Sequence, residues 1–391
     1  MKRGKSSWLL VWFVVKLCIF APAVFAFDVG LVFEQEAEYS GAGDDTSLLY
    51  KGILVPRISG LLGSNGEFII SAGLNYQNDP WAVVPELLHT GLSFGFDGAD
   101  FDIGRMLYSD PLGFIADGLF DGARLTFDTG AGVFGMGAWY TGLLCKRRAN
   151  IEMTQKEYDY NNAAIEYSDF MGTYFAPSRV LAALDWEHAN ITKHFRLKAA
   201  ILGQFDLTSE ELNSQYFIAK MTLPFSGFTL DLGGCFELIQ RNSQTGSGEM
   251  DMAYAAEAGL SWIWQGQGLS FLARHSSGVS DSVTAFLPLT TVSQGNVISE
   301  RLSGLTVFSL DYTARLHETL SFSLIPAYFI DNFDSTLGLM GAEIYGKLDW
   351  RPVSDIFFTL GGGAFLPSLG DIAPNDQSYW KVEMNVIISL F

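Results

Sequence analysis

The sequence predicts an all-β protein: a transmembrane, antiparallel, up-and-down β-barrel of about 18 strands, with 16 as the alternative count. Three observations lead to this fold class. Apolar and polar residues alternate along most of the chain, no stretch after residue 26 is long and apolar enough for a membrane-spanning helix, and short turns alternate with longer connections. An alternation of period two gives a strand one apolar face and one polar face.

The first 26 residues have the pattern of a cleaved secretory leader, which is not part of the fold. Basic residues precede an apolar stretch, and Val24 and Ala26 occupy the small-residue positions before a cleavage site. We therefore expect residues 27–391 to be exported and to form a single domain.

The composition excludes several classes of function. The net charge is −19, and it becomes −23 when the four basic residues of the leader are removed, which argues against binding nucleic acid. Only Cys145 and Cys235 remain in the mature region, so no disulfide framework is predicted. Hydrophobic residues make up 48% and charged residues only 17% of the chain. Such an apolar chain without helical spans is either a large soluble β core or a membrane barrel.

Strands are predicted wherever the alternation persists between turn-forming residues. In order along the chain they cover 27–39, 48–62, 67–77, 86–96, 100–108, 121–128, 132–145, 178–189, 194–206, 214–224, 227–240, 251–264, 268–277, 303–316, 319–330, 339–350, 355–366 and 379–391.

Every second connection between these strands is a tight turn rich in Gly, Asn, Asp or Ser. The tight turns are 63–66, 97–99, 129–132, 190–193, 225–227, 265–268, 317–319 and 351–354, and the longer connections include 109–120, 146–177, 277–302 and 367–378. This order favours an up-and-down barrel with one smooth rim and one elaborated rim over a soluble sandwich or propeller. An even number of strands places both termini at the smooth rim.

The last predicted strand, YWKVEMNVIISLF, shows which phase the apolar faces meet. Val382, Met384 and Leu390 share one parity, and Lys381 and Glu383 share the other. Tryptophan residues close several apolar faces near strand ends, as the aromatic girdles of membrane barrels do. The apolar faces are therefore expected to contact lipid, and the polar faces to line a wet lumen.

The leader, the alternation of turns and loops, and the terminal Phe391 resemble Gram-negative outer-membrane β-barrels. The resemblance implies an outer-membrane location with periplasmic termini, contact with outer-membrane lipid, and insertion by the barrel assembly machinery. In that class the machinery reads a last strand with a terminal aromatic, which makes Phe391 the candidate assembly residue. Residues 101–128, FDIGRMLYSDPLGFIADGLFDGARLTFD, are also similar to large porins and alginate-export-type barrels. Monomer and homo-oligomer both remain open.

Candidate lumen residues are charged positions on the polar faces. If the turn of the hairpin 178–206 centres near Ile191, Glu187 lies opposite His194 and Asp185 opposite Arg196, with Lys198 beyond. This ladder either selects ions in the lumen or stiffens the wall with salt bridges. Further acidic residues of the same faces predict a preference for cations, namely Glu34, Glu36, Asp231 and Glu237.

The long connection 146–177 carries interleaved aromatic residues that offer a second candidate site. It either folds into the pore as a constriction or remains outside as a surface loop. The candidate constriction residues are Tyr158, Tyr160, Tyr167, Phe170 and Tyr174.

Two further positions raise separate hypotheses. His275 and Ser277 resemble the H-x-S core of outer-membrane phospholipase and lipid A deacylase barrels, which implies a lipid hydrolase; the alternative is a strand that ends in a Ser/Gly loop. Arg105 shares the parity of lipid-facing residues, and because a charge there is costly, we expect a bulge to turn it inward.

The sequence as a whole favours a porin-like channel for passive diffusion of small hydrophilic solutes, with a preference for cations. The alternatives are an adhesin or structural barrel with a plugged lumen, and the lipid hydrolase. No cofactor and no metal site are predicted.

Overall fold

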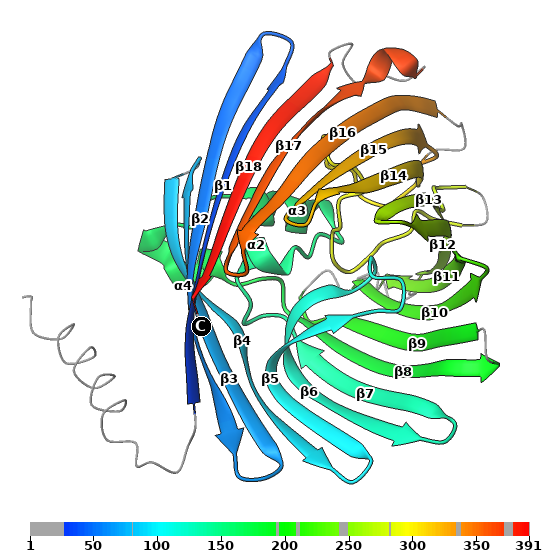
Figure 1. Cartoon of the computed structure of the whole chain (residues 1–391). Coiled ribbons are helices and arrows are strands. Elements are labelled where there is room, and N and C mark those ends of the chain that lie inside the picture. The colour runs from blue at the N-terminus through cyan, green and yellow to red at the C-terminus, as the bar shows by residue number, and fades with distance from the viewer. Residues whose placement is uncertain are drawn as a thin grey trace, which may run out of the picture.

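The computed structural model describes residues 27–79, 81–192, 195–208, 212–241, 249–280, 283–333, 338–370 and 378–390. Its strands form one closed antiparallel sheet of 18 strands, in which each strand pairs with its neighbours in sequence and β1 also pairs with β18 (Figure 1). The predicted fold class is confirmed. His194, Phe391 and the leader 1–26 lie outside the described residues.

Every predicted strand corresponds to one observed strand. The strands are β1 Phe27–Ala42, β2 Asp45–Leu62, β3 Gly66–Asn78, β4 Trp81–Phe96, β5 Ala99–Ser109, β6 Asp117–Thr129, β7 Gly132–Tyr140, β8 Arg179–Thr192, β9 Phe195–Asp206, β10 Leu212–Phe225, β11 Phe228–Arg241, β12 Glu249–Trp264, β13 Gln267–Ser276, β14 Leu305–His317, β15 Leu320–Asp331, β16 Gly338–Val353, β17 Ile356–Leu366 and β18 Tyr379–Leu390.

Short helices occur in the connections. They are α2 Lys146–Ala149, α3 Gln155–Asn162, η1 Tyr167–Asp169, α4 Phe170–Tyr174 and η2 Pro367–Leu369. Within the described ranges, no helix is long and apolar enough to cross a membrane.

The two rims of the barrel differ in the way that the sequence predicts. β1 starts near the turn that follows β2, with Phe27 opposite Gly60, and β18 ends with Leu390 opposite Leu31. Both described ends of the barrel therefore lie at the rim of tight turns, which we call the short-turn rim. The connections 110–116, 141–178 and 277–304 lie at the other rim, which we call the extended rim.

The side chains of the wall alternate between an apolar outside and a polar inside. In β18, Val382 and Met384 are exposed on the outer face, whereas Lys381 and Glu383 pair with each other at 2.7 Å on the inner face. Because the outer face is apolar strand after strand, the wall suits a lipid environment.

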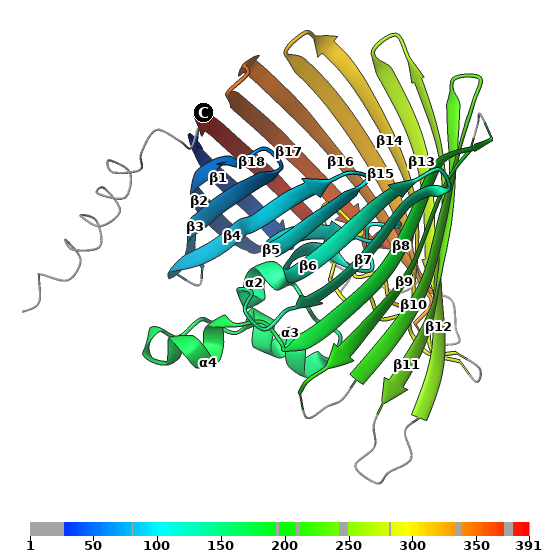
Figure 2. The same ribbon diagram turned by 90° about the horizontal axis from the view of Figure 1, so that it is seen from below.

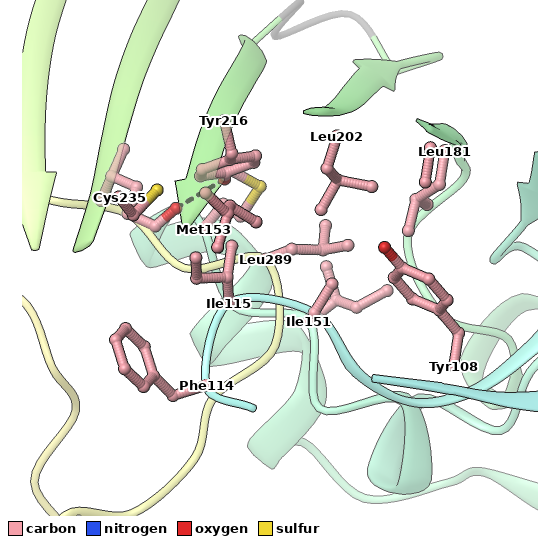
Figure 3. Packing of buried hydrophobic residues seen from close by; sticks show 14 of the residues in the cluster. Tyr108, Phe114, Ile115, Ile151, Met153, Leu181, Leu202, Tyr216, Cys235 and Leu289 are labelled. Carbon is pink, nitrogen blue, oxygen red and sulfur yellow. Dashed lines mark hydrogen bonds between the residues drawn. The ribbon is translucent and has the colours of Figure 1, made fainter. Parts of the chain in front are cut away.

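The connections of the extended rim fold into the barrel as a plug, which we define as residues 110–116, 144–162 and 283–302. Figure 1 shows α2 and α3 within the ring of strands, and Figure 2 shows the same helices from below. Plug residues Ile115, Ile151 and Leu289 are fully buried against Leu202 and Tyr216 of the inner wall (Figure 3). Each such side chain contributes about 1.5–3 kcal/mol through burial, so the plug is a second, apolar core inside the barrel.

The two strand ends that differ most from the prediction are the end of β7 and the start of β4. β7 stops at Tyr140 instead of 145, because the chain leaves the wall there and Leu144 packs in the plug. β4 begins at Trp81 instead of 86, and its first half has no strand neighbour on the β5 side.

Candidate functional site

The plug is anchored first by Asp110, which directly follows β5. Its carboxylate accepts four backbone N–H groups, from Leu112 at 2.7 Å, Gly113 at 3.1 Å, Ile115 at 2.8 Å and Ala116 at 2.9 Å. Burial raises the pKa of Asp110, and the four N–H donors oppose that rise. This single side chain therefore shapes the loop that carries Ile115 into the plug core.

The three plug segments meet around Thr290. Its N–H donates to the carbonyl of Ile115 at 3.1 Å, and its hydroxyl accepts from the N–H of Asp117 at 2.9 Å. Thr290 also forms a bridge with Ile151, next to which the N–H of Thr291 donates to the carbonyl of Asn150 at 2.9 Å. These contacts fix the end of α2, since Asn150 is its C-cap residue in the left-handed conformation.

A buried ion cluster ties α3 to the barrel wall. Arg179 of β8 is 0% exposed and donates to Glu157 of α3 at 2.6 Å and to Gln204 of β9 at 2.6 Å. Asp206 lies 3.4 Å from the same guanidinium. Glu157 also completes a capping box with Thr154, so the start of α3 and the cluster depend on one carboxylate.

Space remains between the plug and the wall formed by β1 to β4. A cavity of about 560 Å³ is lined by Glu34 and Glu36 of β1, Glu86 of β4, and Arg147 and Arg148 of α2. It is mainly charged and amide-lined, in contrast to the apolar core on the other side of the plug.

A second cavity of about 270 Å³ borders the first, and its lining includes Leu49 and Asp79 near the extended rim. Both cavities share Lys51 and Arg147, so these two cations stand at their junction. Together the cavities form the candidate solute pathway.

The charges of the pathway are only partly neutralised. Arg148 is paired with Glu86 at 2.6 Å, and Glu86 also accepts from the amide of Asn75 at 2.6 Å. Lys51 lies 3.7 Å from Glu36, and both side chains are more than a third exposed, so water screens this pair.

Two pathway charges have no ion pair at all within the described residues. Glu34 accepts from the amide of Asn385 at 2.9 Å, and its carboxylate has no cation within salt-bridge distance. The guanidinium of Arg147 forms neither a hydrogen bond nor an ion pair with any described residue and faces the cavity. Glu34 and Glu36 are among the residues predicted from the sequence, but Arg147 is not, although the run KRR at 146–148 was an available signal.

The first residue of that run lines only the smaller cavity, and its charged group is engaged in other contacts. Lys146 is 1% exposed, its ammonium donates to the carbonyl of Tyr160 at 2.7 Å, and it lies 4.3 Å from the centre of the Tyr160 ring. Burial lowers the pKa of Lys146, and the neighbouring Arg147 lowers it further. Lys146 thus holds α2 against α3, and this leaves Arg147 free to face the cavity.

The wall next to the pathway contains a seam between β4 and β5. The two strands pair only from Thr90 opposite Arg105 to the tight turn. At the end of this ladder Arg105 is 5% exposed, with its guanidinium bonded to Asp121 at 2.6 Å and to the carbonyl of Leu87 at 2.6 Å. The expectation that Arg105 avoids lipid is correct. The register of β5 contains no bulge there, and the irregular backbone is at Gly104, with φ of +127°.

Tyrosine side chains close the rest of the seam. The hydroxyl of Tyr167 accepts from the N–H of Val83 at 2.8 Å and donates to the carbonyl of Val83 at 3.1 Å. The hydroxyl of Tyr174 donates to the carbonyl of Pro85 at 2.9 Å. Proline is tolerated at this position, because it has no backbone N–H to donate and the edge of β4 has no neighbouring strand here. The connection 163–176 thereby takes the place of a neighbouring strand.

Replacing Tyr167 with phenylalanine is expected to destabilise this seam by about 1 kcal/mol for each of the two hydrogen bonds lost. The matched control is Tyr158→Phe, because Tyr158 is 51% exposed against 54% for Tyr167 and its hydroxyl bonds no described residue. The check is thermal unfolding of the purified barrel. Equal unfolding temperatures for the two variants would contradict the role assigned to Tyr167.

The candidate constriction residues have other tasks than lining the pathway. Tyr167, Phe170 and Tyr174 pack along the β4 edge, Tyr160 holds Lys146, and Tyr158 lies on α3. The connection 146–177 is thus divided: its first part lies inside the barrel, as in the pore hypothesis, and the second part covers the seam.

The predicted pairing across the hairpin of β8 and β9 is wrong. The register shifts between His188 and Thr192, so the turn is not centred near Ile191. The observed pairs are Glu187 opposite Lys198 and Asp185 opposite Ala200, in place of Glu187 opposite His194 and Asp185 opposite Arg196.

The charges of this hairpin form ion pairs along the inner wall. Glu187 lies 3.1 Å from Lys198 and 3.7 Å from Arg196, and Asp185 lies 2.5 Å from Arg124 of β6. None of these residues lines either cavity of the candidate pathway.

The other two acidic candidates also lie away from the pathway. Asp231 accepts from the hydroxyl of Thr222 at 2.5 Å. Glu237 is 0% exposed and accepts from the N–H of Leu287 at 2.9 Å, so it faces the plug core. The carboxyl group of Glu237 is therefore out of contact with solvent.

The pair of residues behind the hydrolase hypothesis is engaged in other bonds. The hydroxyl of Ser277 donates to the carbonyl of Thr284 at 2.8 Å and accepts from the N–H of Tyr254 at 3.1 Å. His275 instead shares a hydrogen bond of 2.7 Å with Thr306. Among the described contacts, none joins His275 to Ser277.

No family model and no curated protein matches this sequence. Solved structures with the same architecture include Pseudomonas aeruginosa OccK2 (OpdF), at a TM-score of 0.66 and 12% identity, covering 93% of this chain and 97% of that chain. OccK2 in complex with glucuronate gives 0.65 and 10%, covering 93% and 98%. The outer membrane protein OpdK of the same organism gives 0.60 and 12%, covering 93% and 98%. At such identities the likeness concerns the fold: this chain has the closed 18-stranded barrel fold of these Pseudomonas aeruginosa proteins.

Proposed function

We propose that the protein is an outer-membrane channel through which small hydrophilic solutes diffuse passively along the pathway beside α2. The observation that carries the proposal is a pair of charged cavities that share lining residues inside a closed barrel with an apolar outer face. The fold likeness to the outer membrane protein OpdK and to OccK2, which has been solved with glucuronate, supports it.

Several parts of the proposal rest on the sequence. We propose that residues 1–26 are removed on export, that the short-turn rim faces the periplasm, and that Phe391 guides insertion by the barrel assembly machinery. The likeness of residues 101–128 to alginate-export-type barrels is not extended to an anionic polysaccharide, because the chain is strongly acidic.

We further propose that the channel prefers cations. The carboxylates of Glu34 and Glu36 face the pathway, and one has no paired cation while the other has only a screened one. Fixed negative charges in a narrow aqueous passage raise the local concentration of cations.

The test is the reversal potential of the refolded protein in a planar bilayer under a salt gradient. We expect discrete conductance steps and a cation-selective potential. In Glu34→Gln/Glu36→Gln, the ratio of cation to anion permeability is expected to fall several-fold, since one unit charge about 4 Å away is worth about 1 kcal/mol in water. The control is Glu318→Gln in a tight turn of the short-turn rim.

Anion selectivity in the unaltered protein would contradict the proposed cation preference. A folded barrel that carries no current would contradict the proposed channel function. It would favour the plugged structural barrel or adhesin, which the apolar core of the plug supports. We do not propose lipid hydrolysis, because Ser277 is 2% exposed and both of its polar contacts go to the backbone.

A further inference from the structure

The pathway contains a cationic group that no described residue pairs with. Arg147 is fixed by its neighbours: Lys146 is buried against Tyr160, and Arg148 is paired with Glu86. The side chain of Arg147 alone of this run has no hydrogen bond or ion pair with a described residue, although it lines both cavities. A guanidinium has five N–H donors in a planar fork that matches a carboxylate.

The wall of the same cavity contributes negative groups without a strong partner. Glu34 and Glu36 project from one face of β1, since residues two apart on a strand share a face. The only described partner of the Glu34 carboxylate is the neutral amide of Asn385. The partner of Glu36 is the exposed Lys51 at 3.7 Å, a pair that a competing ammonium group can replace.

Apolar side chains complete the lining of the cavity. Ile53 is the register neighbour of Glu34 on β2, and Ala82 and Val84 line the cavity from β4. A solute that reaches both Arg147 and the acids of β1 therefore passes a short aliphatic surface.

From this arrangement we infer that the larger cavity binds dipolar solutes, with the carboxylate at Arg147, the ammonium group at Glu34 and Glu36, and a short aliphatic body between them. Three acidic residues (Glu34, Glu36 and Glu86) and three basic residues (Lys51, Arg147 and Arg148) line this cavity, so a solute with a single charge is attracted by one set and repelled by the other. A solute with both charges satisfies both sides of the cavity. The inference rests on the proposed function, because it makes the pathway the binding site.

The test compares 4-aminobutyrate with butyrate and butylamine, which have the same carbon chain and only one charge. Binding of each compound to the detergent-purified barrel is measured by equilibrium dialysis, and current block by each is measured in bilayers. We expect 4-aminobutyrate to bind about tenfold more tightly than either single-charge compound, the factor that one charge-assisted hydrogen bond supplies.

Variants of the two sides separate the contributions. In Arg147→Gln the affinity for 4-aminobutyrate is expected to fall to that of butylamine, and Arg147→Lys is expected to recover part of the loss, because it keeps the charge without the fork. In Glu34→Gln/Glu36→Gln the affinity is expected to fall to that of butyrate. Arg241→Gln, at the exposed end of β11, is the control and should change nothing.

The outcomes for this site and for the channel are distinguishable. Equal affinities for the three compounds, or an unchanged affinity for 4-aminobutyrate in Arg147→Gln, would overturn the inference. If the barrel still conducts in that case, the proposed channel function stands. A barrel that binds 4-aminobutyrate preferentially but carries no current would support the site and overturn the channel. A barrel that shows neither would overturn both.

Discussion

Replacing Arg179 with methionine is expected to lower the free energy of unfolding by about 3–5 kcal/mol, the usual cost of removing one member of a buried ion cluster. Methionine fills a similar volume but donates no hydrogen bond, so the carboxylates of Glu157 and Asp206 lose their cation inside the protein. The loss also frees the start of α3. The measurement is the temperature at which the folded band of the barrel disappears on a denaturing gel, together with the noise of the channel current.

The matched control is Arg196→Met, because Arg196 is also paired with a glutamate but is 53% exposed. Its removal should change stability by no more than about 0.5 kcal/mol. The double variant Arg179→Met/Glu157→Gln should recover part of the loss, since it removes one stranded charge. If Arg179→Met unfolds at the temperature of the unaltered protein, the cluster does not hold the plug.

The fold could be predicted because its determinants are local. Alternation of apolar and polar residues defines each strand on its own, and tight turns such as that at 63–66 define where two strands meet. In β18 the exposed Val382 and Met384 and the inward Lys381 and Glu383 follow the predicted parity without exception. Neither feature depends on distant contacts.

The prediction was wrong where inward side chains meet the plug. The residues after Tyr140 are apolar enough to extend β7, but Leu144 turns into a core that includes Phe286 and Leu289, more than a hundred residues away. The start of β4 was missed for a similar reason. Its edge is completed by Tyr167, 84 residues later, and no local pattern announces that contact.

The register of β8 and β9 and the pathway itself were also beyond local inference. Alternation fixes which face of the sheet a residue occupies but not its partner across a hairpin. The register irregularity between His188 and Thr192 places Glu187 opposite Lys198. Within the connection 146–177, the aromatic residues were selected as candidate constriction residues because of their residue type. Charged side chains of α2, Arg147 among them, line the cavity instead, because Asn150 at the end of α2 is held by a segment some 140 residues further along.

Replacing Asp110 with alanine is expected to release the plug. Four backbone N–H groups, including those of Leu112 and Ile115, would lose their acceptor in a buried environment, at a cost of about 1–3 kcal/mol for each group that water does not reach. The loop 110–116 would then no longer present Ile115 to Thr290 and Ile151. Because these contacts also position α2, a larger and noisier conductance should accompany the lower unfolding temperature.

The isosteric variant Asp110→Asn separates the hydrogen bonds from the packing. Its amide keeps one acceptor oxygen and loses the other, so about half of the N–H groups remain satisfied and the loss of stability should be intermediate. The amide nitrogen would also meet the remaining N–H groups with a donor, which prevents full recovery. If the alanine variant instead keeps the unfolding temperature and single-channel current of the unaltered protein, Asp110 is not the anchor of the plug, and Arg179 and the packing of Ile151 and Leu289 must hold it alone.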